Sequence, residues 1–263
     1  SVVETEKYLD FFLCAFSSIL KSCSKWLTKS IKPQIDPQKQ AKDVWEEFCK
    51  QILKMERANE TSEVVEENNA EILTQSVLEL NITEPFVDLL VTSPPYVTSY
   101  EYADIHQLST LWLDYSPDYK HFRTGSIGSL YHSCDLRFNV PKLNQSGLTV
   151  VMQMYSVDKK QAKAIAQYYV NMQAVVKKIC NIVKKGGACL FVIGNTEYKN
   201  VKIDNARHLA ESLLNEGFYN VTIKRRKILN KILTPYRDKN GKFSSDKTSR
   251  KIYSEEFLIF AQL

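Results

Sequence analysis

Apolar residues near the N-terminus recur at steps of three and four positions, the spacing of one face of an α-helix. This spacing predicts a helix over residues 4–28 and a second helix over about residues 38–60, separated by two prolines. The apolar face of the first helix contains Leu9, Phe12, Leu13, Phe16, Ile19 and Leu20. Residues 61–69 are polar and acidic and are predicted to be a linker, so residues 1–60 are expected to form a separate helical region.

From residue 70 onward, short continuous apolar runs alternate with segments of helical spacing. Such runs are typical of strands buried on both faces of a parallel sheet, and their alternation with helices predicts an α/β fold. The predicted strands are residues 70–74, 86–92 and 188–193, and the predicted helices are 98–115, 159–185 and 204–216. The last two strands, 219–228 and 256–261, predict a C-terminal antiparallel hairpin. We expect residues 70–263 to form one domain.

The predicted strand 86–92 ends at Ser93-Pro94-Pro95-Tyr96, which is the most informative stretch of the chain. Each proline fixes its own φ and restricts the residue before it, so this segment is a stiff rim. A hydroxyl and a proline carbonyl can accept the N–H bonds of an amino group, and a tyrosine ring can stack on a flat heterocycle. The alternative is a strand that simply ends in a Pro-Pro turn, and four letters alone do not exclude it.

Composition permits an enzyme without naming one. The chain has 263 residues, 44% of them hydrophobic and 25% charged, with a net charge of +5 that is compatible with nucleic acid. Its six cysteines contain no CxxC pair and its four histidines are scattered, so we predict no metal site and reduced thiols. No apolar run approaches the ~18 residues of a membrane span, and no signal peptide is evident. A cytoplasmic location is therefore expected.

The motif lies at the carboxyl end of a predicted strand, where open α/β sheets bind their ligands. The segments 11–32, 87–113, 186–196 and 224–260 together resemble bacterial site-specific DNA amino-methyltransferases of the SPPY type. The resemblance covers most of the chain. It implies a Rossmann-like methyltransferase sheet with the C-terminal hairpin, preceded by the N-terminal helical pair, in a setting of DNA methylation and restriction-modification.

The resemblance implies methyl transfer from S-adenosylmethionine to an exocyclic amino nitrogen of a base flipped out of the duplex. Ser93 and the Pro94 carbonyl would accept the amino N–H bonds, Pro95 would stiffen the rim, and Tyr96 would stack on the base. A serine at the first motif position favours N4 of cytosine over N6 of adenine. No Pro-Cys dipeptide occurs, which argues against cytosine-C5 chemistry and its thiol nucleophile.

The cofactor site departs from this pattern. Methyltransferases of this type have a Phe-x-Gly-x-Gly loop, which is missing here, and Gln75-Ser76 replaces an acidic residue that contacts the adenine. The remaining candidates for cofactor contact are Ser76, Thr92, Ser93 and Asn195. Three explanations are open: a fragment, a split enzyme whose partner chain supplies the loop, or a subunit that has lost catalysis. We favour the partnered enzyme.

A basic stretch follows the last helix. Residues 224–251 contain 11 Lys or Arg against two Asp, a net of +9, and are predicted to track DNA phosphates. The candidates are Lys224, Arg225, Arg226, Lys227, Lys231, Arg237 and Lys242. The alternative is a solvated loop in a lysine-rich protein. Two rival functions also stay open: a non-catalytic methyltransferase-like DNA-binding or scaffold subunit, and an RNA base-amino methyltransferase.

Overall fold

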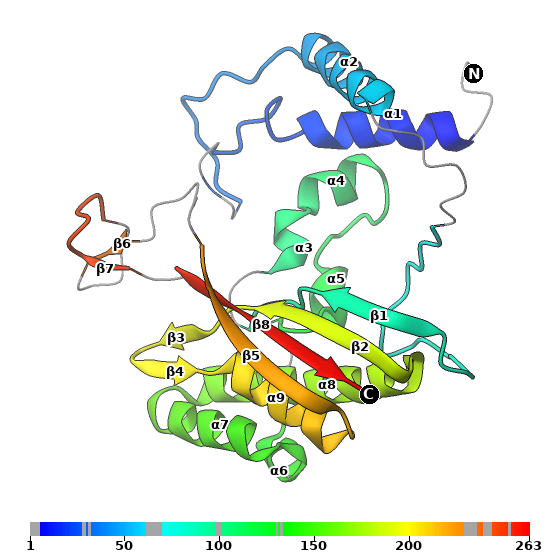
Figure 1. Cartoon of the computed structure of the whole chain (residues 1–263). Helices are drawn as coiled ribbons and strands as arrows, with labels where there is room; N and C mark the ends of the chain where they lie inside the picture. The colour runs from blue at the N-terminus through cyan, green and yellow to red at the C-terminus, as the bar shows by residue number, and fades with distance from the viewer. Residues whose placement is uncertain are drawn as a thin grey trace. The chain divides into compact units, whose positions relative to one another are not determined.

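The computed structural model divides the chain into two compact units (Figure 1). One unit comprises residues 1–73 and 101–126, and the other comprises residues 74–100 and 127–263. The structure describes residues 6–27, 30, 33–61, 70–97, 101–129, 131, 134–228, 236–238, 244–251 and 254–263. Residues 101–126 therefore group with the N-terminal helices, while the predicted domain boundaries at residues 60 and 70 stay predictions.

The first unit is helical. It contains α1 (Glu6–Ile19), α2 (Val44–Thr61), α3 (Tyr102–Ile105), α4 (Gln107–Trp112) and α5 (His121–Gly125). Helix α1 packs on α2 through the rings of Phe12 and Phe48, whose centroids lie 6.3 Å apart. It contacts α4 through Phe16 and Trp112, with ring centroids 6.2 Å apart. Aromatic contacts therefore hold the unit together.

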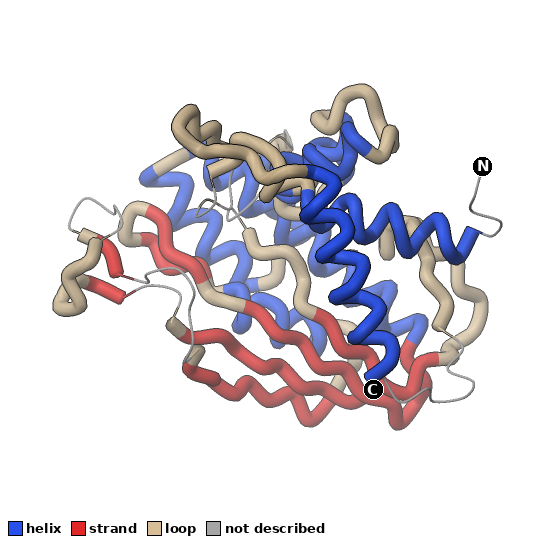
Figure 2. The backbone as a smooth tube through the Cα atoms, turned by 90° about the horizontal axis from the view of Figure 1, so that it is seen from above, coloured by secondary structure: helices blue, strands red, loops and turns tan. Residues whose placement is uncertain are grey.

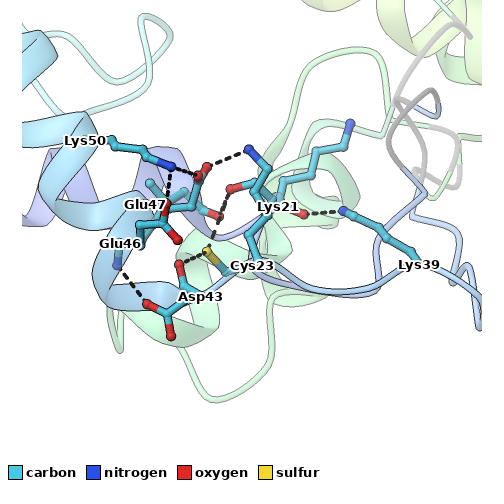
Figure 3. Close-up of polar contacts among 10 residues, drawn as sticks. Lys21, Cys23, Lys39, Asp43, Glu46, Glu47 and Lys50 are labelled. Atoms are coloured by element: carbon cyan, nitrogen blue, oxygen red, sulfur yellow. Dashed lines mark hydrogen bonds and ion pairs between the residues drawn. The ribbon is translucent and has the colours of Figure 1, made fainter.

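Helix α1 ends at Ile19, well before residue 28, so the predicted length of this helix was wrong. Serine side chains beyond that point bond to the backbone instead: the Ser22 hydroxyl donates to the Ile19 carbonyl and the Ser24 hydroxyl to the Lys21 carbonyl. Such local bonds compete with helical hydrogen bonding. The ammonium group of Lys39 then donates to the Lys21 carbonyl at 2.8 Å (Figure 3). It also donates to the Trp26 carbonyl at 2.8 Å, and the two bonds fix the turn.

Asp43 caps the start of α2 (Figure 3). Its carboxylate accepts a hydrogen bond from the Glu46 amide at 2.8 Å, which satisfies one of the amides left unpaired at a helix N-terminus. Glu46 pairs with Lys50 one turn later at 2.5 Å, and Glu47 pairs with Lys42 at 2.8 Å. The second helix therefore begins at a capped position inside the predicted range 38–60.

The second unit is a mixed α/β structure. Its sheet has the strand order β1-β2-β8-β5, formed by β1 (Val87–Thr92), β2 (Val183–Ile193), β8 (Glu255–Gln262) and β5 (Tyr219–Lys227). Strands β1 and β2 are parallel, whereas β8 is antiparallel to both β2 and β5. The last two predicted strands therefore pair as an antiparallel hairpin. Residues 70–74 form no strand, and Ile72 in them is 86% exposed, so that prediction was wrong.

Helices cover one face of this sheet (Figures 1 and 2). They are α7 (Gln145–Val157), α8 (Lys159–Ile182) and α9 (Asn205–Asn215), with the short α6 (Leu136–Asn139) and η1 (Val140–Lys142) beside them. Two small ladders complete the unit: β3 (Thr196–Tyr198) with β4 (Val201–Ile203), and β6 (Tyr236–Arg237) with β7 (Arg250–Lys251).

Several helix predictions need correction. Helix α8 ends at Ile182 rather than at residue 185, because the Ile182 carbonyl accepts a hydrogen bond from the Phe86 amide and the chain continues as β2. The predicted helix 98–115 is two short helices, α3 and α4, separated at His106 (φ −92°, ψ 6°), and residues 98–100 lie outside the described part. Residues 116–150, which are assigned no strand or helix from the sequence, contain α5, α6, η1 and the start of α7.

The core lies between the sheet and its helices. Phe191 and Ile259 from neighbouring strands are fully buried, and α8 contributes the buried Tyr168 and Tyr169. The opposite face of β1 is open: Leu89 is 59% exposed and Val91 61% exposed, so the prediction of a fully buried strand was wrong. Within its own unit, β1 is at the edge of the described sheet, and the helices of that unit cover one face of the sheet.

One buried histidine belongs to this core. His208 on α9 is 1% exposed, and its ring stacks on Tyr169 with centroids 3.9 Å apart. Burial lowers the pKa of His208 to about 3, because a charged imidazolium would lose its hydration there. His208 is therefore neutral at ordinary pH.

The described residues contain neither a membrane span nor a metal cluster. No described helix is long and apolar enough to cross a membrane. No group of three or more His, Cys, Asp or Glu side chains in the described part of the chain is placed to hold a metal ion.

Candidate functional site

Strand direction brings three segments together where the strands of the sheet end. Since β8 is antiparallel to both β2 and β5, the strands β1, β2 and β5 all run the same way. Their carboxyl ends therefore share an edge. Ser93 follows β1 there, Gly194 follows β2, and the basic residues of β5 end there at Lys227. This is the edge at which open α/β sheets hold ligands.

Ser93 is exposed at this edge, and its hydroxyl is oriented. The Ser93 Oγ donates its proton to the Val192 carbonyl at 3.0 Å, across the gap between β1 and β2. A hydroxyl has one proton and two lone pairs, so a hydroxyl that donates inward presents acceptor capacity outward. The arrangement suits a ligand that offers an N–H group to the Ser93 oxygen.

The second proline of the motif is tied to the helical layer. Tyr168 on α8 is 2% exposed and donates its phenol proton to the Pro95 carbonyl at 2.9 Å. Pro94, which precedes Pro95 in the motif, is buried. The bond joins residues 73 positions apart in sequence, so it anchors the motif to the core and limits movement of the rim.

Tyr96 lies directly over a glycine. A Cβ atom added at Gly194 would lie 3.0 Å from the Tyr96 Cε2 and 3.4 Å from its Cζ, so the ring would have to shift by a few tenths of an ångström. Gly128 lies near the backbone of Tyr96, since a Cβ there would lie 3.5 Å from both the Tyr96 carbonyl and the Tyr168 ring. Gly128 has φ +90°, which favours glycine. The ring of Tyr96 is therefore held half-buried against β2.

The predicted cofactor residues are only partly brought together. Thr92 and Ser93 are adjacent at the end of β1, and Asn195 follows β2 at the same edge. The Asn195 side chain is engaged within the fold, because it donates to the Asp204 carboxylate at 2.8 Å and accepts from the Ala206 amide at 3.0 Å. It therefore orders the start of α9.

Ser76 belongs to the segment that precedes β1. Its hydroxyl accepts a hydrogen bond from the Leu78 amide at 3.3 Å, and the residue is exposed. The contacts of Ser76 are thus those of a local turn, and its predicted cofactor contact stays a prediction.

The basic stretch is partly ordered. Four of the predicted contacts lie on β5 with their side chains exposed to solvent: Lys224, Arg225, Arg226 and Lys227. Arg237 lies in β6, whereas Lys231 and Lys242 fall outside the described residues. The structure therefore describes four of the predicted phosphate contacts at the end of β5 and a fifth, Arg237, in β6.

A comparison with curated proteins finds a relative of this chain. Over 245 residues the chain is 24% identical to the type II methyltransferase M.MvaI of Kocuria varians. The chain is similar to a methyltransferase. The alignment covers 84% of this chain and 53% of M.MvaI, so the chain spans about half the length of the curated relative it matches.

The other comparisons add little. No protein-family model matches the chain. A Thermus thermophilus protein described as a DNA modification methylase is 11% identical, with a TM-score of 0.26, over 41% of this chain and 40% of that chain. That likeness is too slight to support any argument about this fold.

Sequence reasoning missed three residues that support the motif: Tyr168, Gly194 and Gly128. Gly194 carried a signal, because a glycine that directly follows a buried strand permits close approach of another group. Tyr168 carried none. It is one apolar position among many on a long helix, and only the fold places it 2.9 Å from the Pro95 carbonyl.

The bond from Tyr168 predicts a measurable change in stability. Replacing Tyr168 with Phe leaves the Pro95 carbonyl without this donor, and we expect the free energy of unfolding to fall by about 1 kcal/mol. Chemical denaturation followed by circular dichroism measures it. Tyr155→Phe is the control, because Tyr155 on α7 is 40% exposed and its contact with Lys159 uses the ring. Equal stability of the Tyr168→Phe protein and the wild type would contradict the anchoring role.

Proposed function

We propose that this chain is the base-binding part of an S-adenosylmethionine-dependent DNA methyltransferase that acts on an exocyclic amino group, with N4 of cytosine favoured over N6 of adenine. The observation that carries the proposal is the inward hydrogen bond of Ser93 to the Val192 carbonyl, which leaves an oriented acceptor at a ligand-binding edge. The similarity to M.MvaI over 84% of the chain supports the same reaction class.

Each motif residue has a role in this proposal. The Ser93 oxygen and the Pro94 carbonyl accept the two N–H bonds of the amino group, which turns its lone pair out of the ring. Tyr96 stacks on the flipped base, and Gly194 gives its ring room against β2. Tyr168 holds the Pro95 carbonyl and so keeps the rim in place. These contacts orient the nitrogen for attack.

The sheet supports a Rossmann-like arrangement. Its order β1-β2-β8-β5, with a parallel first pair and an antiparallel strand inserted before the last, is what the later part of such a methyltransferase sheet would have. We therefore propose that β1 is an inner strand of a larger sheet in the complete enzyme.

The bound cofactor would supply an electrophilic methyl group. The described residues fit only the part of it that lies beside the motif, since Thr92 and Ser93 offer hydroxyls while the Asn195 side chain is engaged with α9. The chain has no glycine-rich loop for the amino-acid end. These residues do not make a whole cofactor site.

We propose that polypeptide outside residues 1–263 completes the site and adds to the edge of β1. Among the described residues β1 has one strand neighbour, β2. An apolar strand with an open edge is suited to pairing with a further strand.

Cofactor binding tests this proposal. Isothermal titration of residues 1–263 with S-adenosylmethionine is expected to show little heat, because most of the cofactor pocket lies elsewhere. Affinity should appear when the completing polypeptide is present, and S-adenosylhomocysteine should behave alike. Tight binding by the chain alone would refute the divided site.

One observation favours a second function. The missing glycine loop is also what a non-catalytic, methyltransferase-like DNA-binding subunit would show. Such a subunit would bind DNA but leave methylation unchanged when Ser93 is replaced. Mass spectrometry of methylated nucleosides, made by the complete enzyme, separates this function from catalysis and also distinguishes N4-methylcytosine from N6-methyladenine.

A further inference from the structure

The ribbon β5–β8 carries four cations beside two carboxylates. Arg225 and Arg226 each form an ion pair with a glutamate of β8: Arg225 with Glu255 at 3.6 Å, and Arg226 with Glu256. The strand register explains the second pair, because Arg226 lies directly opposite Glu256. Each of the two arginines of the ribbon therefore has a glutamate of β8 as its ion-pair partner.

The two lysines differ from the arginines. Lys224 lies opposite the apolar Leu258, and Lys227 lies opposite Glu255, whose carboxylate is taken by Arg225. Within the described part of the chain, neither Lys224 nor Lys227 takes part in an ion pair. Both residues are exposed, so both ammonium groups are available to an external anion.

The two glutamate side chains are less exposed to solvent than the two arginine side chains. The side chain of Glu256 is 15% exposed and that of Glu255 is 35% exposed, against 57% for Arg226 and 63% for Arg225. The Arg226 Nε also donates to Glu256 at 2.6 Å, so this pair has two guanidinium contacts. A phosphate that approaches Arg226 meets the carboxylate as well, and gains little net attraction.

We propose that Lys224 and Lys227 are the phosphate contacts of this ribbon, and that Glu255 and Glu256 hold its arginines out of DNA binding and so limit its affinity. The inference rests on the proposed action on DNA. It goes further by dividing the four predicted contacts into two that bind phosphate and two that are internally neutralised. The ribbon ends at the end of the sheet that carries Ser93. Lys224 and Lys227 are three positions apart on its outer strand β5 and point to opposite faces, so a duplex would meet both along the outer edge of that strand.

The salt dependence of DNA binding measures this division. Each phosphate contact contributes about 0.9 to the slope of log affinity against log salt for duplex DNA. We expect Lys224→Gln with Lys227→Gln to lower that slope by about 2, with several-fold weaker binding. Arg225→Gln with Arg226→Gln should change it much less.

The glutamate variant gives the decisive result. Glu255→Gln with Glu256→Gln releases both arginines, so the slope should rise by up to about 2 and binding should tighten several-fold. Asp88→Asn is the matched control. It removes the carboxylate that pairs with Lys184 at 2.9 Å, near the start of β1 at the other end of the strand from Ser93, and should give no such gain.

The probe is a duplex of about 20 base pairs, with fluorescence anisotropy read between about 50 and 200 mM salt on the whole chain. Equal losses from the lysine and arginine variants would overturn the division of the ribbon while leaving DNA binding intact. An unchanged glutamate variant, or a gain matched by Asp88→Asn, would overturn it too. Failure of the wild-type chain to bind the duplex would overturn both this inference and the proposed DNA contact.

Discussion

Replacing Ser93 with Ala is expected to lower methyl transfer by the complete enzyme about 100-fold, the effect of removing one oriented hydrogen-bond partner from a developing charge. The amino nitrogen of a base is a poor nucleophile because its lone pair is delocalised into the ring. The Ser93 oxygen would accept one of its N–H bonds while donating to the Val192 carbonyl. Alanine removes this acceptor and leaves the strand otherwise unchanged.

Transfer of a radiolabelled methyl group to duplex DNA measures the loss of activity. Ser156→Ala is the matched control, because the exposed Ser156 hydroxyl also donates to a backbone carbonyl, that of Gln153, but on α7. The control should retain full activity. If the Ser93→Ala enzyme transfers methyl groups as fast as the wild type, the proposed chemical role of Ser93 is wrong, whatever the affinity of the variant for DNA. If turnover is kept and only the apparent substrate affinity falls, Ser93 binds the base without activating it.

The sequence could predict the parts of this fold that depend on local pattern. The apolar runs 86–92 and 188–193 are strands in the structure, and the terminal pair of strands forms an antiparallel hairpin. The position of the motif directly after a strand also follows from pattern, since Pro-Pro cannot continue a central strand. The shared edge then follows from strand direction alone.

The sequence could not predict features that depend on what covers a strand. An apolar run indicates burial, but Leu89 and Val91 are exposed because their side chains lie on the face of the sheet opposite its helices. Residues 70–74 have the composition of a strand and no described neighbour to pair with. Hydrogen bonds between distant residues, such as Tyr168 to Pro95, likewise have no local signature.

His208 carries the largest effect expected on stability. A histidine with a folded pKa of about 3 and an unfolded pKa of 6.5 binds protons more readily when the chain unfolds. The unfolded state is therefore favoured as pH falls below 6.5. At pH 5 the cost is about 2 kcal/mol, from roughly 1.5 pH units at 1.36 kcal/mol each. The stabilisation is fully present above pH 6.5 and is lost progressively toward pH 3.

Two carboxylates with lowered pKa values, Asp158 and Glu211, titrate below the interval from pH 7 to pH 5. Contacts lower the pKa of Asp158 to about 2, chiefly because it accepts the Gln161 amide at the start of α8. The pKa of Glu211 is also below its ordinary value of 4.5: burial raises it, and bonds from the Ser146 and Gln145 amides outweigh that effect. A lowered carboxyl pKa weakens the folded state only as pH falls below the unfolded value. Their contributions therefore begin below about pH 4.5 and add little between pH 7 and pH 5, where the contribution of His208 changes by about 2 kcal/mol.

Urea denaturation of the wild type and of His208→Gln at several pH values tests this assignment. The variant loses the stack on Tyr169 and should be less stable throughout, but its stability should fall by about 2 kcal/mol less between pH 7 and pH 5. Circular dichroism is the appropriate probe, since Trp26, Trp45 and Trp112 all belong to the helical unit and His208 belongs to the other unit. Parallel pH profiles for the two proteins would mean that His208 is not the group that titrates, and that its ring is hydrated or protonated in the folded chain.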